Sequence, residues 1–176
     1  MRAGERTAYP TAVVSAAAED ARALALELAG MNPPQRIDAM ALGVVTEPGE
    51  EVLRAVMCWV RWRVDGQWSE ALWCRGIVTT QRLLVRLPDG SLRSQWWSTV
   101  VGFDADLHAG HVVLDYGDGR PRQIAGPAAA VVAVAGIYVL YGTEALVKHP
   151  SLEPLRAHEP PPDVERGSKR QSWPLS

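Results

Sequence analysis

A series of short β-type segments, each followed by a turn signal, constrains the fold of this chain more than any other feature. In the first of them, Val56, Cys58 and Val60 fall on one side of the chain, and Arg61 and Arg63 fall on the other. This alternation is typical of a strand with one buried face and one exposed face. We therefore expect the core to be built on a β-sheet.

Turn sequences separate this segment from those that follow. Asp65-Gly66, Asp89-Gly90 and Gly117-Asp118-Gly119 each suit a tight hairpin. The strands are expected at residues 52–64, 72–80, 83–87, 92–101, 111–116 and 122–125, with a bend near residue 102. Strands spaced by about ten residues with turns between them indicate an antiparallel sandwich or partly open barrel, here of about seven strands. The expected class is mainly β, with added helices.

One helix is expected before the β region. Residues 15–29 carry a narrow apolar stripe at helical spacing, and Ser15 can cap the first turn. The stripe consists of Ala17, Ala21, Leu24 and Leu28. We expect it to dock on the body of the domain, and contact with a partner is the alternative.

A second helix is expected after the last strand. Residues 128–141 are rich in Ala and Val and carry no charge, and Pro127 fits a first helical turn. The uncharged stretch covers residues 125–143, close to the length of a membrane span. Because Ala and Gly contribute little to membrane insertion, a buried helix that closes the end of the barrel is the preferred interpretation.

These elements divide the chain into three parts. Residues 1–46 form an N-terminal extension with one helix, residues 47–146 form the β domain, and residues 147–176 form an extended C-terminal tail. The tail is rich in Pro and charge, so it has little with which to build a core.

Composition narrows the function and the compartment. The net charge of −2 argues against a protein that coats nucleic acid. Cys58 and Cys74 are expected as free thiols in the core, and with four scattered His they give no metal-binding spacing. No continuous apolar run follows the first residues, so we expect a cytoplasmic protein.

One stretch carries a resemblance to a known fold. Residues 76–85 read Gly-Ile-Val-Thr-Thr-Gln-Arg-Leu-Leu-Val, and the likeness rests on Gly76, Thr79, Thr80, Arg82, Leu83 and Leu84. With the strands around it and the helix after them, this stretch resembles the pleckstrin-homology superfold in its short bacterial, GRAM-like form. The likeness covers roughly residues 48–145.

The resemblance implies a binding module. Members of the superfold bind phosphoinositide headgroups, other lipids, peptides or partner proteins. The lipid-binding members place Lys and Arg around the first hairpin loop, whereas residues 65–70 here are acidic and contain no basic residue. The usual headgroup site is therefore not favoured.

Aromatic and basic side chains supply the candidate interaction residues. Six Trp lie between residues 59 and 97, in a chain with one Phe. Most are expected to pack in the core, but the adjacent Trp96 and Trp97 cannot both do so if the strand alternates. The candidates for contact with a partner are Trp68, Trp96, Trp97, Arg61, Arg63, Arg75 and Trp173. The arginines at 61, 63, 75, 82, 86 and 93 would form a basic stripe if several share one face.

Catalysis finds little support in the sequence. Asp104, Asp106, His108 and His111 could hold a metal on paper, but they surround a predicted turn, where Asp and His are common. Triad, phosphate-loop and dinucleotide motifs are missing.

The sequence thus favours a non-enzymatic PH-like module that mediates protein–protein interaction or assembly. A protein partner or a second copy of the chain is expected, without a cofactor, nucleic acid or small-molecule substrate. The alternative is a peripheral membrane module that binds acidic lipid. A metal-dependent or otherwise cryptic enzyme is the third hypothesis.

Overall fold

One open antiparallel sheet forms the body of the protein in the computed structural model, which describes residues 8–157. Its strands pair in the order β5-β4-β3-β1-β8-β7-β6, and the short β2 pairs with β1 beside this path. The strands are β1 (Val52–Val64), β2 (Gln67–Trp68), β3 (Leu72–Thr79), β4 (Arg82–Arg86), β5 (Leu92–Trp96), β6 (Gly102–Asp106), β7 (His111–Asp115) and β8 (Arg122–Ala125). The expected class, an antiparallel and partly open β structure with added helices, is confirmed.

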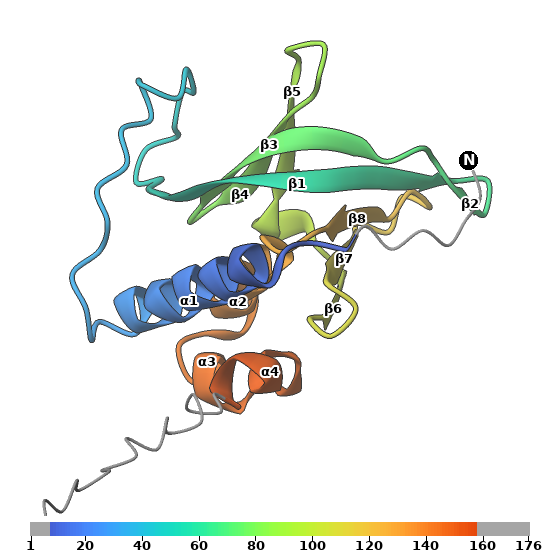
Figure 1. Cartoon of the computed structure of the whole chain (residues 1–176). Coiled ribbons are helices and arrows are strands. Elements are labelled where there is room, and N and C mark those ends of the chain that lie inside the picture. The colour runs from blue at the N-terminus through green and yellow to red at the C-terminus, as the bar shows by residue number, and fades with distance from the viewer. Residues whose placement is uncertain (1–7, 158–176) are drawn as a thin grey trace, which may run out of the picture.

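The helices lie on one side of this sheet. Figure 1 shows α1 and α2 below β1 and β3, with α3 and α4 farther from the sheet. Their bounds are α1 (Thr11–Leu28), α2 (Ala129–Tyr141), α3 (Ala145–Lys148) and α4 (Glu153–Arg156), with short 3-10 turns at η1 (Trp97–Thr99) and η2 (Pro150–Leu152). The opposite side of the sheet therefore faces away from all four helices.

The first hairpin forms where the sequence predicts it. Asp65 and Gly66 both have positive φ, 48° and 76°, as a type I′ turn requires. The flanking residues Val64 and Gln67 pair directly, so the turn fixes the register of β1 against β2.

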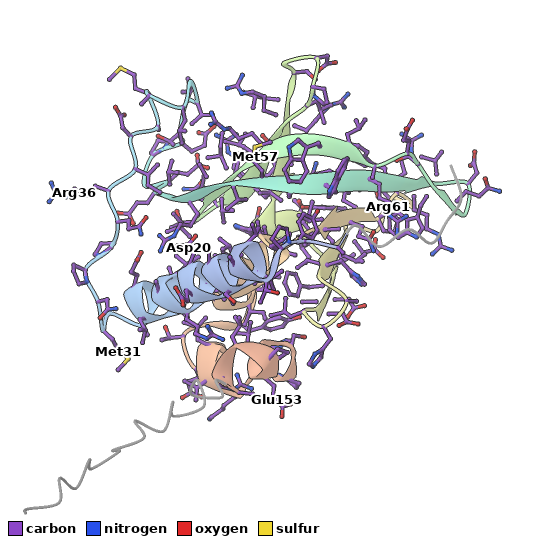
Figure 2. The ribbon with its side chains drawn as sticks, viewed as in Figure 1. Asp20, Met31, Arg36, Met57, Arg61 and Glu153 are labelled. Carbon is purple, nitrogen blue, oxygen red and sulfur yellow. The ribbon has the colours of Figure 1, made fainter. Side chains whose placement is uncertain are left out.

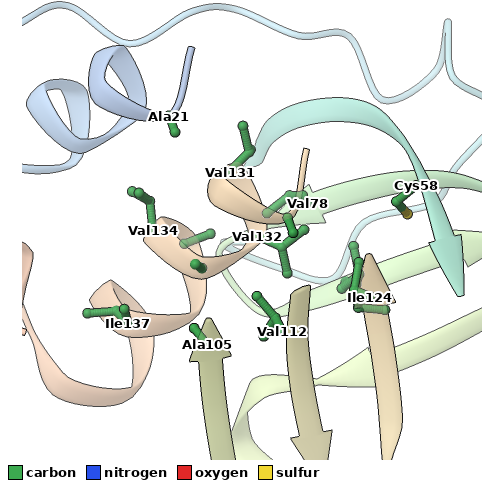
Figure 3. Close-up of a cluster of buried hydrophobic side chains, with 14 of the residues drawn as sticks. Ala21, Cys58, Val78, Ala105, Val112, Ile124, Val131, Val132, Val134 and Ile137 are labelled. Carbon is green, nitrogen blue, oxygen red and sulfur yellow. The ribbon is translucent and has the colours of Figure 1, made fainter. Parts of the chain in front are cut away.

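The core lies between the sheet and α2. Alternate residues of β1 and β3 point inward, among them Cys58, Val60 and Val78, and meet the valines of α2 (Figure 3). Helix α2 is apolar on all sides, as expected for a helix buried all round. Within residues 8–157, the structure contains no helix that is both long and apolar enough to cross a membrane.

Helix α1 belongs to the same core. Ala21 and Leu24 of the predicted stripe are fully buried, which confirms that this face docks on the domain. Arg54 of β1 reaches the helix and pairs with Asp20 and Glu27, both at 2.7 Å (Figure 2 labels Asp20).

The start of α1 differs from the prediction. The helix begins at Thr11, so Ser15 lies inside it and caps nothing. The carbonyl of Pro10 accepts the first helical hydrogen bonds, from Val13 and Val14. Since Pro lacks an N–H, it precedes a helix without losing a hydrogen bond.

The predicted strand at 92–101 is wrong in its second half. β5 ends at Trp96, the chain turns through η1, and β6 starts at Gly102 on the opposite edge of the sheet. Trp97 turns inward, and its indole N–H donates to the carbonyl of Thr79 at 3.0 Å. One continuous segment, residues 92–106, thus supplies both edge strands.

The C-terminal prediction also needs correction. An extended tail was expected from residue 147, but the chain forms α3, η2 and α4 as far as Arg156. Leu146 and Leu152 are buried, and Arg22 of α1 donates to the carbonyl of Leu155 at 2.6 Å. This contact attaches the segment to the first helix. The rest of the predicted tail, residues 158–176, lies outside the described residues.

Candidate functional site

The side of the sheet that faces away from the helices carries the candidate site. Strand pairing places Met57 opposite Arg75, Arg75 opposite Arg86, and Arg86 opposite Leu92, so these four residues form one row across four strands. Trp59 and Trp73 pair in the next row. We call the following set the outer face: Met57, Trp59 and Arg61 on β1, Trp73 and Arg75 on β3, Arg86 on β4 and Leu92 on β5 (Figure 2 labels Met57 and Arg61).

Large apolar side chains on the outer face are open to solvent. Met57 is 41% exposed, Trp73 is 42% exposed and Leu92 is 40% exposed. Met57 and Trp73 lie on adjacent strands in neighbouring rows, whereas Leu92 lies beyond Arg75 and Arg86 at the other end of the row. We call these three side chains together the patch, which is apolar at both ends and basic between them. Large apolar side chains exposed on one face of a sheet and bordered by polar residues are a feature of interaction sites.

The tryptophan row is held in place from the N-terminal side. The rings of Trp59 and Trp73 lie 5.0 Å apart with a tilt of 52°, a favourable geometry for two aromatic rings. The indole N–H of Trp59 donates to the hydroxyl of Tyr9 at 2.8 Å. Trp73 thus packs against a ring that is itself held by a hydrogen bond, and it remains partly exposed among the described residues.

In the part of the chain that the structure describes, the arginines of the outer face have no acidic partner. Arg75 and Arg86 are direct cross-strand neighbours, and neither forms an ion pair with any residue from 8 to 157. Arg86 donates from one nitrogen to the carbonyls of Leu42 and Gly43, at 3.2 and 3.3 Å. Among residues 8–157, the outer face therefore combines exposed apolar side chains with two guanidinium groups that pair with no acid.

A loop closes one end of the outer face. Val44 packs on Ile77 and Leu84, which form the row next to Met57 and would otherwise be exposed. Partly buried Ile37 and Leu42 complete this small second core. The open part of the sheet begins where this loop ends, at Arg86.

The structure separates the predicted pair Trp96 and Trp97. Trp97 is only 1% exposed and lies in the core, so the prediction that it contacts a partner is wrong. Trp96 is half-buried, and the guanidinium of Arg82 lies 4.4 Å from its ring centre. Alternation fails here because the chain leaves the strand at Trp97.

The predicted arginine stripe is partly assembled. Arg61, Arg63, Arg75 and Arg86 lie on the outer side of the sheet, whereas Arg93 pairs with Val85 and points to the other side. Arg82 is buried and forms an ion pair with Glu50 at 2.9 Å. Four of the six arginines thus lie on the open outer side of the sheet, and Arg75 and Arg86 are the two that are direct cross-strand neighbours.

The first hairpin holds the remaining candidates. The guanidinium of Arg61 lies 4.9 Å from the ring centre of Trp68, and Arg63 donates to the carbonyl of Gly66 at 3.3 Å. These contacts extend the outer face toward the hairpin tip. Trp173 lies outside the described residues.

Sequence reasoning did not select Met57, Trp73 and Leu92 as site residues. The sequence did contain a signal for two of them. Met57 and Trp73 each precede a buried cysteine, Cys58 and Cys74, so alternation along the strand places them on the exposed side of the sheet. Their proximity, however, follows from strand register, which alternation within one strand does not determine.

The proposed metal ligands do not form a site. Within residues 8–157 no group of three or more His, Cys, Asp or Glu side chains is arranged to hold a metal. Asp106 accepts the backbone N–H of Ala109 at 2.9 Å, and this bond is the main reason why the pKa of its carboxyl is lowered. The acid shapes the β6–β7 turn.

The comparisons with known proteins add no relative. No protein-family model, curated protein or solved structure matches this chain. The outer face is therefore the part of the molecule that points to a function.

Proposed function

We propose that this protein is a non-enzymatic binding module that contacts a protein partner through the outer face. The observation that carries the proposal is the patch formed by Met57, Trp73 and Leu92, each about two-fifths exposed, beside Arg75 and Arg86. Trp, Met and Arg are the residue types enriched in protein interfaces. A rigid sheet presents them without the entropic cost of ordering a loop.

The PH-like resemblance is part of this proposal. The seven-strand path is followed directly by α2, which packs across the inner side of the sheet. This order of elements agrees with the one that suggested the likeness. The proposed role as a binding module, in contrast, depends on the outer face.

A peripheral membrane module is the second candidate. The observation in its favour is the hairpin tip, where Trp68 lies beside Arg61 and Arg63. A Trp flanked by basic residues suits a membrane interface. The acidic residues Asp65 and Glu70 in the same loop oppose binding to an anionic surface.

Selection from a displayed random-peptide library tests the proposed function. Immobilised wild-type protein is compared with the double variant Met57→Ser/Trp73→Thr, and Val64→Thr serves as the matched control. Val64 is also 42% exposed and lies on β1, but on the other side of the sheet. Enrichment on the wild type and the control, with loss on the double variant, supports the proposal.

The opposite pattern would contradict it. If peptides are enriched equally on the wild type and on Met57→Ser/Trp73→Thr, or on neither protein, the outer face is excluded as the binding surface. Circular dichroism and urea unfolding establish that the variants are folded. Flotation with phosphatidylserine-containing vesicles tests the membrane candidate, which requires co-migration that depends on Trp68.

A further inference from the structure

We infer that the segment bound on the outer face is an acidic protein segment, whose carboxylates pair with Arg75 and Arg86 while its apolar side chains cover Met57, Trp73 and Leu92. This inference rests on the proposed function and specifies the chemistry of the partner. It follows from charge, register and exposure on the same surface.

Arg75 and Arg86 supply the positive charge that would bind an acidic partner. They are directly opposite on β3 and β4, where like charges repel each other. In the described part of the chain no carboxylate lies within ion-pair distance of either one. A guanidinium binds a carboxylate through two parallel hydrogen bonds, so a bound acid would relieve the repulsion and add directional contacts.

Arg75 and Arg86 differ from the other arginines because they are direct cross-strand neighbours on an open sheet face. An arginine without an ion pair is common in this protein, since only three arginines within residues 8–157 form one. Arg54 and Arg82 each meet a glutamate, and Arg122 meets Asp118 at 2.7 Å. Within residues 8–157, the paired arginines are Arg54 on the inner side of β1, Arg82 at the covered end of the sheet and Arg122 on β8. The open part of the outer face is where two adjacent arginines lack an acid.

The exposed apolar residues of the outer face limit the kind of molecule that can carry the bound carboxylates. Met57 and Leu92 lie at the two ends of the arginine row, and Trp73 lies in the next row. An isolated small anion would leave this surface uncovered. A peptide segment that carries both acidic and apolar side chains covers the arginines and the patch together.

The surrounding charges favour a narrow chain over a flat anionic bilayer. Asp65, Glu70 and Asp89 lie in or next to the hairpin turns at the ends of the strands and are exposed. They would repel a continuous negative surface that approached the whole face. A peptide lying across the strands needs contact only with the rows between those turns.

The test is the amino-acid composition of the peptides selected from the random library, determined by sequencing them. We expect sequences enriched on the wild type to contain an excess of Asp and Glu among apolar residues. The double variant Arg75→Gln/Arg86→Gln should bind the enriched peptides at least about tenfold more weakly, and the wild-type affinity should fall as salt is added. Arg93→Gln is the matched control, because Arg93 is exposed on β5 but points to the other side.

The outcomes separate this inference from the proposed function. The enriched peptides could lack an acidic excess, require Trp73 and bind Arg75→Gln/Arg86→Gln as well as they bind the wild type. That result would overturn the inference and leave the proposed function standing. A lack of enrichment on the wild type would overturn both. The wild type could instead bind no peptide but bind phosphatidylserine vesicles, or form dimers in light scattering. If Arg75→Gln/Arg86→Gln abolishes that vesicle binding or dimerisation, the inference is overturned in favour of a membrane or a second copy of the chain.

Discussion

Arg82 donates two hydrogen bonds to the carboxylate of Glu50, from Nε at 2.9 Å and from Nη2 at 3.1 Å. The glutamate side chain has no exposed surface. The same carboxylate accepts the hydroxyl of Thr79 at 2.6 Å, and Arg82 also donates to the carbonyl of Val45 at 2.8 Å. This pair attaches the loop before β1 to the β3–β4 turn, and thereby to the covered end of the outer face.

Glu50→Gln should therefore destabilise the fold strongly. It leaves the buried guanidinium of Arg82 without its counter-charge, which typically costs about 3–5 kcal/mol of unfolding free energy. Urea unfolding at neutral pH measures the change. Glu47→Gln is the control, because Glu47 is an exposed acid of the same turn. Equal effects of the two substitutions would show that the pair contributes little.

Stability should fall in acid. Burial by itself would raise the pKa of Glu50, but hydrogen bonds from Arg82 and Thr79 outweigh it and hold the pKa below the ordinary value. The hydrogen bond from Arg54 lowers the pKa of Glu27. A carboxyl with a lowered folded-state pKa contributes stability that is present above the unfolded value, about 4.3, and is lost as pH falls through the folded value.

The matching measurement is the free energy of unfolding between about pH 6 and pH 3. The wild type should lose stability over the lower part of this range. Glu27→Gln removes one of the carboxyls with a lowered pKa, so its curve should be flatter. Parallel curves for the wild type and this variant would contradict the role given to Glu27.

Gly136→Ala should destabilise the protein, although the same change in an ordinary helix is stabilising. A Cβ at this position would lie 2.6 Å from Cε2 of Phe103 and 3.3 Å from Cζ3 of Trp97. Overpacking of this kind costs about 1–3 kcal/mol, more than the gain of about 0.5–1 kcal/mol in helix propensity. Thermal unfolding tests it, and Phe103→Leu in the same chain should recover part of the loss. A more stable Gly136→Ala protein would show that α2 packs differently.

Arg75→Glu should stabilise the protein slightly. It converts the like-charged pair with Arg86 into an opposite-charged pair, and such cross-strand changes contribute about 0.2–1 kcal/mol. Arg93→Glu is the control, since its cross-strand neighbour is Val85. If both substitutions shift the urea midpoint alike, the register between β3 and β4 is not as described.

Cys58 and Cys74 should resist thiol reagents in the folded protein. They pair directly on the buried side of β1 and β3, and burial raises the pKa of the Cys58 thiol to about 12. Reaction should follow the unfolding of the sheet, so both thiols should become reactive together as urea is added. One thiol that reacts rapidly without urea would contradict the packing of this strand pair.

The sequence predicts the parts of this fold that depend on local pattern. Alternation placed Cys58 and Val60 in the core, and Asp65-Gly66 indicated the first hairpin. Trp97 was misplaced because a strand pattern does not record where the chain leaves the strand. The short helices α3 and α4 span too few residues to show a period, so the end of the domain was missed.

The candidate site was predictable only in part. Arg61 and Arg75 could be assigned to an exposed face from their own strands. The row that joins Met57, Arg75, Arg86 and Leu92 depends on the register of three strand pairs, which is set by several turns and by core packing together. No single segment of the sequence contains that information.

The indole N–H signals of the tryptophans, recorded by NMR while a library-selected peptide is added, test the outer face as a binding surface most directly. Trp73 and Trp59 should shift, because they lie on the outer face. Trp97 should not, because its indole is buried against Thr79. Shifts confined to Trp68 or Trp97, with Trp73 unchanged, would contradict the account.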